Sequence, residues 1–295
     1  MKKIIFSVFC LYFAFTAIAQ DWGESEAADQ ADACSSRRGI YLLPEYDDFA
    51  LGIDVSLFLN YLGGFLSGSG RAEPNIFKQT TIYGKYFIAD DRAVRAKIML
   101  DMQNTAHKNT VPDDYEMINN PLNDNATVID IHHISSFDIG LNLGYELRRG
   151  KGRVQGFYGG EVGLGFKTAK GKFDWANPIT EANQSPSSSV GVFPDAGTRG
   201  ERTTKINPGK VFKAGVGGFA GVEYFFAPQM SLGCEFDLAF MIRMEGQPKK
   251  TTERWNSSIG KVESRSGSYG DWDARTIKMI TGPVYGGHIY IMFHF

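Results

Sequence analysis

The stretch that ends the chain, Tyr285–Phe295, reads Y-G-G-H-I-Y-I-M-F-H-F and decides the fold class. Its side chains change character with a period of two, as in a β-strand whose two faces meet different surroundings. One face carries Ile289, Ile291, Phe293 and Phe295. The other face carries His288, Tyr290, Met292 and His294. This alternation predicts a strand that runs to the last residue, with one apolar face and one more polar face.

The same period of two recurs in seven earlier segments. The expected strands are 51–61, 81–89, 93–103, 137–147, 154–166, 211–226, 231–244 and a terminal strand that starts near 276. Short polar turns at 90–92, 149–153 and 227–230 join neighbouring strands into hairpins. Long loops are expected at 62–78, 104–136, 168–210 and 246–275. The sequence therefore predicts an all-β fold made of eight antiparallel strands.

Charged residues are confined to one face of these strands. The apolar faces of six of them, all except the second and the last, carry no charged side chain. An Arg or Lys that faces lipid at the middle of a bilayer costs about 2–4 kcal/mol, whereas charges inside a barrel can pair. We therefore interpret the charged residues of the opposite faces as a network in a barrel lumen. These residues are Asp54, Lys85, Arg95, Lys97, Asp101, Glu146, Glu161, Lys213, Glu223, Glu235 and Asp237.

Alternation alone leaves open which face is inside, because a secreted soluble barrel would bury the apolar face instead. Three features favour a transmembrane barrel. The polar faces are rich in glycine, for example Gly140, Gly144 and Gly163, which suits a crowded lumen. The strands have the length of about 9–11 residues or more that a tilted crossing needs. Short turns alternate with long loops, as in barrels with short periplasmic turns and long extracellular loops.

The amino-terminal residues 1–19 predict a secretory signal peptide. Lys2 and Lys3 precede an apolar run, and Ala17-Ile18-Ala19 predicts cleavage before Gln20. Residues 20–48 follow as an acidic periplasmic arm, which we expect to be disordered, and residues 49–295 form the barrel. The net charge of −2 offers no basic footprint for nucleic acid.

Two hairpins carry a family resemblance. Tyr86–Ala96 (Y-F-I-A-D-D-R-A-V-R-A) and Gly221–Gly233 (G-V-E-Y-F-F-A-P-Q-M-S-L-G) resemble the porin-family outer-membrane β-barrel domain. That group shares its architecture with the small barrels typified by the OmpA membrane domain and OmpX. The Ala-x-Ala-Gln site is similar to signal peptides of Bacteroidota. The resemblance implies the outer membrane of a Gram-negative cell, and a carboxy-terminal assembly signal at Phe293 and Phe295 that the barrel-assembly machinery reads.

Three arrangements could carry chemistry, and we interpret each of them structurally. His132 and His133 are adjacent on a strand, so they point to opposite faces and do not suit one metal ion. Ser135, Ser136 and His133 are compatible with a lipid-modifying enzyme, but no motif brings them within hydrogen-bond reach. We expect no catalytic, cofactor-binding or metal site. The pairing of Cys34 with Cys234 stays open.

These observations predict a non-enzymatic outer-membrane barrel with a structural or surface-recognition role, exercised through its long extracellular loops. The alternatives are a narrow channel for small solutes or ions, and a component of an envelope secretion or assembly apparatus. The name porin does not carry over as an activity, because an eight-stranded barrel is just wide enough to fill with side chains. The expected partners are outer-membrane lipid and lipopolysaccharide, the assembly machinery, and a surface ligand or periplasmic partner.

Overall fold

The computed structural model describes residues 42–55, 80–120, 123, 125–150, 152–269 and 278–295, with backbone alone for 278–285. The expected signal peptide and the first part of the acidic arm lie outside the described residues. The same holds for residues 56–61 of the first expected strand and for the loop 62–78. No helix among the described residues has the length and apolar character needed to cross a bilayer.

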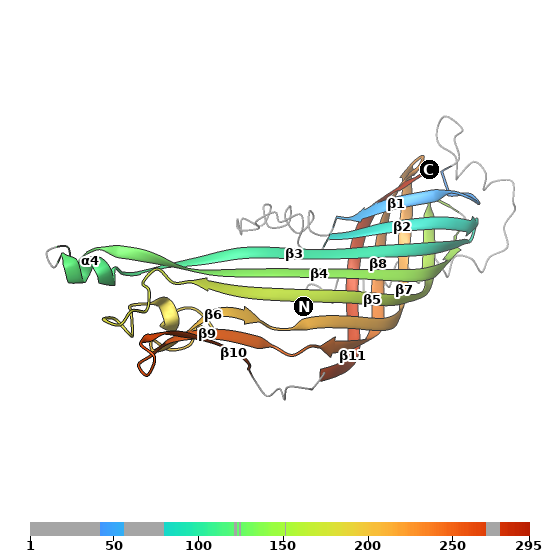
Figure 1. The fold of residues 1–295 in the computed structure, drawn as a ribbon. Helices are drawn as coiled ribbons and strands as arrows, with labels where there is room; N and C mark the ends of the chain where they lie inside the picture. Colours follow the sequence, from blue (N-terminus) through green and yellow to red (C-terminus); the bar gives the residue numbers. More distant parts are fainter. Residues whose placement is uncertain (1–41, 56–79, 121–122, 124, 151, 270–277) are drawn as a thin grey trace, which may run out of the picture.

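Eight antiparallel strands close into a barrel, as the sequence predicts (Figure 1). They are β1 (Phe49–Asp54), β2 (Thr80–Ala89), β3 (Arg92–Pro112), β4 (Thr127–Arg149), β5 (Val154–Asp174), β7 (Lys210–Ala227), β8 (Met230–Glu245) and β11 (Lys278–His294). The ring closes where β1 pairs with β11 through Leu51 and Phe293, and where β5 pairs with β7. The last strand, β11, therefore closes the ring by pairing with the first strand, β1.

The three short turns lie where the sequence places them. β2 and β3 join through Asp90 and Asp91, and β7 and β8 join through Pro228 and Gln229, whose φ is 61°. Gly150 begins the turn between β4 and β5 with a φ of 143°. A Cβ atom on Gly150 would stand 2.8 Å from the Val154 carbonyl oxygen, so this turn requires glycine.

The expected loops 104–136, 168–210 and 246–275 contain regular structure, and the prediction of plain loops there is wrong. β3, β4 and β5 continue well past the ring, and β5 then pairs with β6 (Glu201–Asn207), which adds β9 (Lys249–Asn256) and β10 (Lys261–Ser268). Both faces of these extensions carry polar residues, such as Asn104, Thr105 and Lys108, so they show no period of two. Cross-strand pairing forms them nonetheless.

These extensions form a projecting lobe on one side of the barrel, which Figure 1 shows extending away from the ring. The lobe comprises residues 103–120, 125–136 and 169–207 together with β9, β10 and Tyr269, and it includes the short helix α4 (Asp114–Asn119) and the 3-10 turn η2 (Ser189–Gly191). Its core is an apolar cluster on one face of the sheet. The members are Phe173, Phe193, Ala196 and Ile206, with Trp175, Val190 and Tyr269 packed against them.

The loop between β5 and β6 is held in place, although its serine-rich sequence is typical of a mobile segment. Asp130 is fully buried and accepts hydrogen bonds from the backbone N–H and the hydroxyl of Ser189, both at 2.8 Å. Asp114 accepts from the Asn183 amide at 2.6 Å and from the Ser187 N–H at 2.7 Å. These carboxylates substitute for the regular pairing that the loop lacks.

The end of the expected arm, residues 42–48, lies against the turn end of the barrel. The Asp47 N–H donates to the Phe87 carbonyl at 2.9 Å, and the Tyr46 N–H donates to Asp90 at 3.2 Å. Leu43 and Tyr46 line a polar hollow together with Arg148 and Gln155 of the lumen. This segment therefore covers part of the lumen at its turn end.

Candidate functional site

The barrel lumen holds a buried charge network in layers, and the first layer lies near the turn end. Lys85 contacts Glu146 at 3.0 Å and Glu223 at 3.3 Å. Arg148 contacts the same two carboxylates at 2.9 and 2.8 Å. All four side chains are at most 2 % exposed. Two cations thus share two anions, so each carboxylate receives two charge-assisted contacts.

The second layer centres on Glu235. Arg95 holds this carboxylate with both terminal nitrogens, at 2.6 and 2.7 Å, which is the bidentate geometry that favours arginine. Lys97 contacts Glu235 at 3.1 Å, Glu161 at 3.2 Å and Asp237 at 3.1 Å. Arg95 also reaches Glu146 at 3.5 Å, so the two layers form one network.

The third layer is more open and faces the lobe. His288 lies between two carboxylates, with Nδ1 at 2.7 Å from Asp54 and Nε2 at 3.3 Å from Asp237. Lys213 contacts Asp138 at 2.5 Å. Asp101 stands directly opposite Asp138 in the register of β3 and β4, at the lobe side of the lumen. Arg243 stands opposite Lys213 and Lys167 stands opposite Asp138, so both acidic and basic groups line this mouth.

Aromatic rings fill the space between the charges. The Arg95 guanidinium lies 3.8 Å from the Phe219 ring centroid, and the Lys85 ammonium lies 4.6 Å from that of Phe157. Facing glycines make room for such rings: a Cβ atom on Gly233 would overlap the Tyr290 ring. Cations placed over ring faces gain further stabilisation, and more so when desolvated. The lumen at these levels is a packed core.

All eleven residues that the sequence assigns to the lumen face inward, and most of them belong to the network. Sequence reasoning missed Arg148 and Asp138, because Arg148 follows the expected end of its strand and Asp138 lies at the expected start. Leu147 and Phe137 face outward, and because side chains alternate along a strand, their neighbours Arg148 and Asp138 face the lumen. Phe293 and Phe295 of the expected assembly signal face outward, and Phe295 pairs with Phe49 through backbone bonds of 2.7 and 3.1 Å.

A serine, a histidine and a carboxylate meet in the first layer, but in an order unsuited to nucleophilic catalysis. The Ser231 hydroxyl lies 2.6 Å from Glu223 and 3.0 Å from Nε2 of His294. The carboxylate thus binds the serine rather than orienting the far side of the imidazole, as a triad requires. Ser231 and Glu223 are also fully buried, so a substrate has no access to them.

The histidine pair of β4 is split between the faces of the lobe, as its adjacency predicts. His132 stacks on Phe173 with ring centroids 4.0 Å apart, and burial lowers its pKa, with a further lowering by neighbouring His107. His133 lies on the opposite face, 3.4 Å from Asp174. Ser135 shares the face of His133, while Ser136 has the parity of the inner face.

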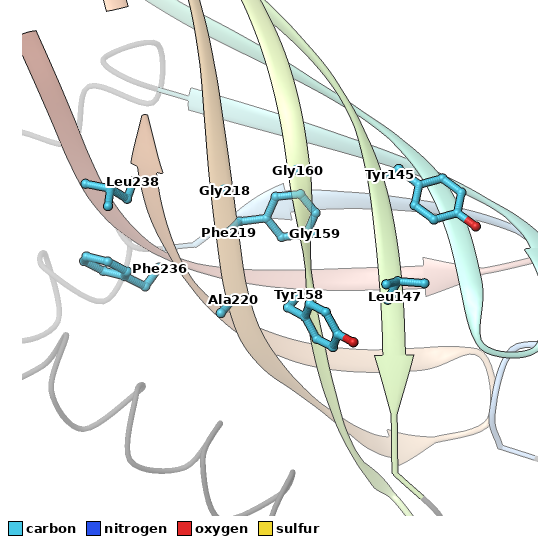
Figure 2. Close-up of a pocket in the computed structure, with 10 residues that line it drawn as sticks. All are labelled: Tyr145, Leu147, Tyr158, Gly159, Gly160, Gly218, Phe219, Ala220, Phe236 and Leu238. Carbon is cyan, nitrogen blue, oxygen red and sulfur yellow. The ribbon is translucent and has the colours of Figure 1, made fainter. Parts of the chain in front are cut away.

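Two further features lie on the outside of the barrel. A groove of about 600 Å³ runs between larger apolar side chains over Gly160, Gly218 and Ala220 (Figure 2). Its lining contains no charged residue, so it belongs to the apolar outer surface. Cys234 is disulfide-bonded, and the chain's other cysteines, Cys10 and Cys34, lie outside the described residues.

No family model matches the chain. No curated protein matches it either. One solved structure, described as a major outer membrane protein from Thermus thermophilus, is similar over 85 % of this chain and 100 % of that chain, with 10 % sequence identity and a TM-score of 0.38. A likeness this weak supports no conclusion about this chain.

Proposed function

We propose that the chain is a non-enzymatic barrel of a bacterial outer membrane, which carries an ordered recognition lobe on the cell surface. The observation that supports this proposal most is the outer face of the ring. Aliphatic side chains such as Leu143, Val162 and Leu164 point outward and are exposed, Leu164 by 67 %. Between the aromatic residues that border this face at its two ends, no outward position of the described barrel strands carries a charge.

Aromatic side chains border this aliphatic band at both ends. The turn end carries Phe49, Tyr86, Tyr145, Tyr158, Tyr224, Phe226, Phe293 and Phe295. The lobe end carries Phe137, Phe166 and Phe212. Tyr158 and Phe166 lie on one strand, separated by about 27 Å at ~3.4 Å per residue. With a tilt of about 40°, this distance spans about 21 Å along the membrane normal, close to the ~25 Å apolar band between the aromatic girdles of membrane barrels.

The lobe is the part of the molecule that would meet other molecules at the cell surface. In barrels of this kind, the short turns face the periplasm and the long connections face outward. The lobe has its own apolar core, and its helix α4 displays Tyr115 and Ile118, which are 71 % and 66 % exposed. Exposed apolar side chains on an ordered support favour recognition of a macromolecule over a passive loop.

The lumen argues against the alternative of a channel. Its first two layers consist of side chains that pair with each other and are almost fully buried, including Lys85, Arg95 and Glu235. A conducting path would need several of these ion pairs to open together, and unpaired buried charges are costly. We therefore expect a structural lumen. The assembly machinery would be an obligatory partner during insertion, acting on the strand that ends in Phe295.

Cell fractionation tests this proposal directly. We expect the full-length protein in the outer-membrane fraction, soluble only with detergent, with a gel mobility that changes on boiling. Protease added to intact cells should cut within the lobe and leave the barrel. Planar-bilayer recordings should show no conductance steps. A processed protein that remains soluble and monomeric without detergent would refute the proposal.

A further inference from the structure

Five lysines gather on the outward face of the wall just beyond the aromatic residues of the lobe end. They are Lys170 and Lys172 on β5, Lys205 on β6, Lys210 on β7 and Lys249 on β9. Their common face follows from the strand register, in which directly opposed residues share a face. Lys172 stands opposite Lys205, Lys210 stands opposite Thr168, and Thr251, two residues from Lys249, stands opposite Lys205. We call this group the lysine patch.

The patch lies at the place where the wall of the barrel divides. β5 pairs with β7 up to Thr168 and with β6 at Gly171 and Lys172. Phe166 and Phe212 mark the end of the apolar band on these strands, with ring centroids 5.1 Å apart. Lys170 follows Phe166 by four residues on the same face, about 13 Å farther along the strand. The lysines thus begin where the apolar band ends.

The charges of the patch are mostly uncompensated. Lys172 pairs with Asp174 at 2.7 Å, and Asp174 also contacts His133. Glu253 has the same face as Lys249, but it is bound by Arg202 at 2.7 Å. Among the described residues, no ion pair involves Lys170, Lys205, Lys210 or Lys249, and all four are exposed. Like charges opposed across two strands, as at Lys172 and Lys205, destabilise a sheet unless an anion lies between them.

We propose that the lysine patch binds the phosphate groups of an anionic lipid in the outer leaflet. This inference rests on the proposed function, because it requires this end of the band to lie at the outer membrane surface. The lipid's acyl chains would lie along the apolar band, and its phosphates would reach the lysines beyond Phe166 and Phe212. Lysine binds phosphate as a point charge, so several lysines can share a diphosphorylated headgroup without one fixed geometry.

Lipid binding by the full-length protein in mild detergent tests the proposal. The probes are diphosphorylated lipid A and the same lipid after removal of both phosphates, with bound copies counted by native mass spectrometry. The test variant is Lys172→Gln/Lys205→Gln, which removes the opposed pair. The matched control is Lys250→Gln/Lys261→Gln, which removes two lysines whose positions in β9 and β10 give them the opposite face of the sheet. The gel mobility change on boiling verifies that each variant is folded.

The wild type and the control should retain the diphosphorylated lipid in preference to the dephosphorylated one. The test variant should bind the diphosphorylated lipid at least about tenfold more weakly, since each lysine near an anionic surface strengthens such binding on the order of fivefold. Equal binding of both lipids by the wild type, or equal binding by the two double variants, would overturn the proposal. If the protein fractionates with the outer membrane but gives either of these results, the lipid-binding inference is wrong and the proposed function stands.

Discussion

The lumen and the projecting lobe bury their side chains by different means. In the lumen, acidic and basic side chains are buried together, and Glu146, Glu223 and Glu235 each contact at least two basic side chains. In the lobe, the core consists of stacked rings such as Phe173 and Trp175, and two carboxylates, Asp130 and Asp114, hold the covering loop. The barrel exposes most of its aliphatic residues outward, so its interior is held by ion pairs together with the aromatic rings packed between them.

The largest effect should follow from removing one lumenal anion. Glu235→Ala would leave Arg95 buried with only its longer contacts, to Glu146 at 3.5 Å and to Glu161 at 3.9 Å. Losing one partner of a buried ion pair costs about 3–5 kcal/mol. We expect the barrel to unfold at clearly lower urea concentration, measured by the loss of the compact form on unboiled gels. Glu263→Gln, which removes a partly exposed partner of Arg265 on β10, is the control and should leave the transition unchanged.

A substitution in the lobe should act locally by comparison. Phe173→Ala removes the ring that stacks on both His132 and Trp175, and such truncations cost about 3–5 kcal/mol in a packed core. We expect protease to cut the segment 175–200 faster than in the wild type, while the urea transition of the barrel stays in place. A simultaneous loss of barrel stability would mean that the two regions fold as one unit.

A smaller effect is expected where a ring of the lumen meets the wall. Gly233→Ala places a methyl group against the Tyr290 ring, and such overpacking costs about 1–3 kcal/mol. Gly160→Ala is the matched control, because its Cβ atom would meet nothing nearer than 3.7 Å. Gly233→Ala should therefore unfold at a lower urea midpoint than Gly160→Ala. Equal midpoints would show that the lumen yields more readily than its contacts indicate.

The smallest effect concerns pH and should be confined to the lobe. Burial lowers the pKa of His132, so below the ordinary value of about 6.5 the unfolded lobe takes up a proton that the folded lobe resists. The lobe is therefore most stable above this value and loses stability as the pH falls. Amide exchange in 175–200, corrected for intrinsic rates, should accelerate several-fold from pH 7.5 to 5.5. His132→Phe should abolish that dependence.

The barrel could be predicted from the sequence because lipid-facing and lumenal positions impose a period of two. Strand β8, with Leu232, Leu238 and Phe240 outward against Glu235 and Asp237, shows why the inward residues were recognisable. The pairing partners were not predictable, since parity fixes a face and not a register. The lobe escaped prediction because residues such as Asn104 and Thr105 are polar on both faces, and its core draws Phe173, Phe193 and Ile206 from distant segments.

The hairpin of β9 and β10 has a position that matters for engineering. In the order of the sheet, β10 is the last strand, and β9 and β6 separate it from the closed ring. Its connecting residues 257–260 include Gly260, which has a φ of 60° and open space where a Cβ atom would stand. Foreign peptide inserted there would lengthen the hairpin at the edge of the sheet and leave the strand pairings of the closed ring unchanged. We expect this turn to accept epitope grafts for display on living cells.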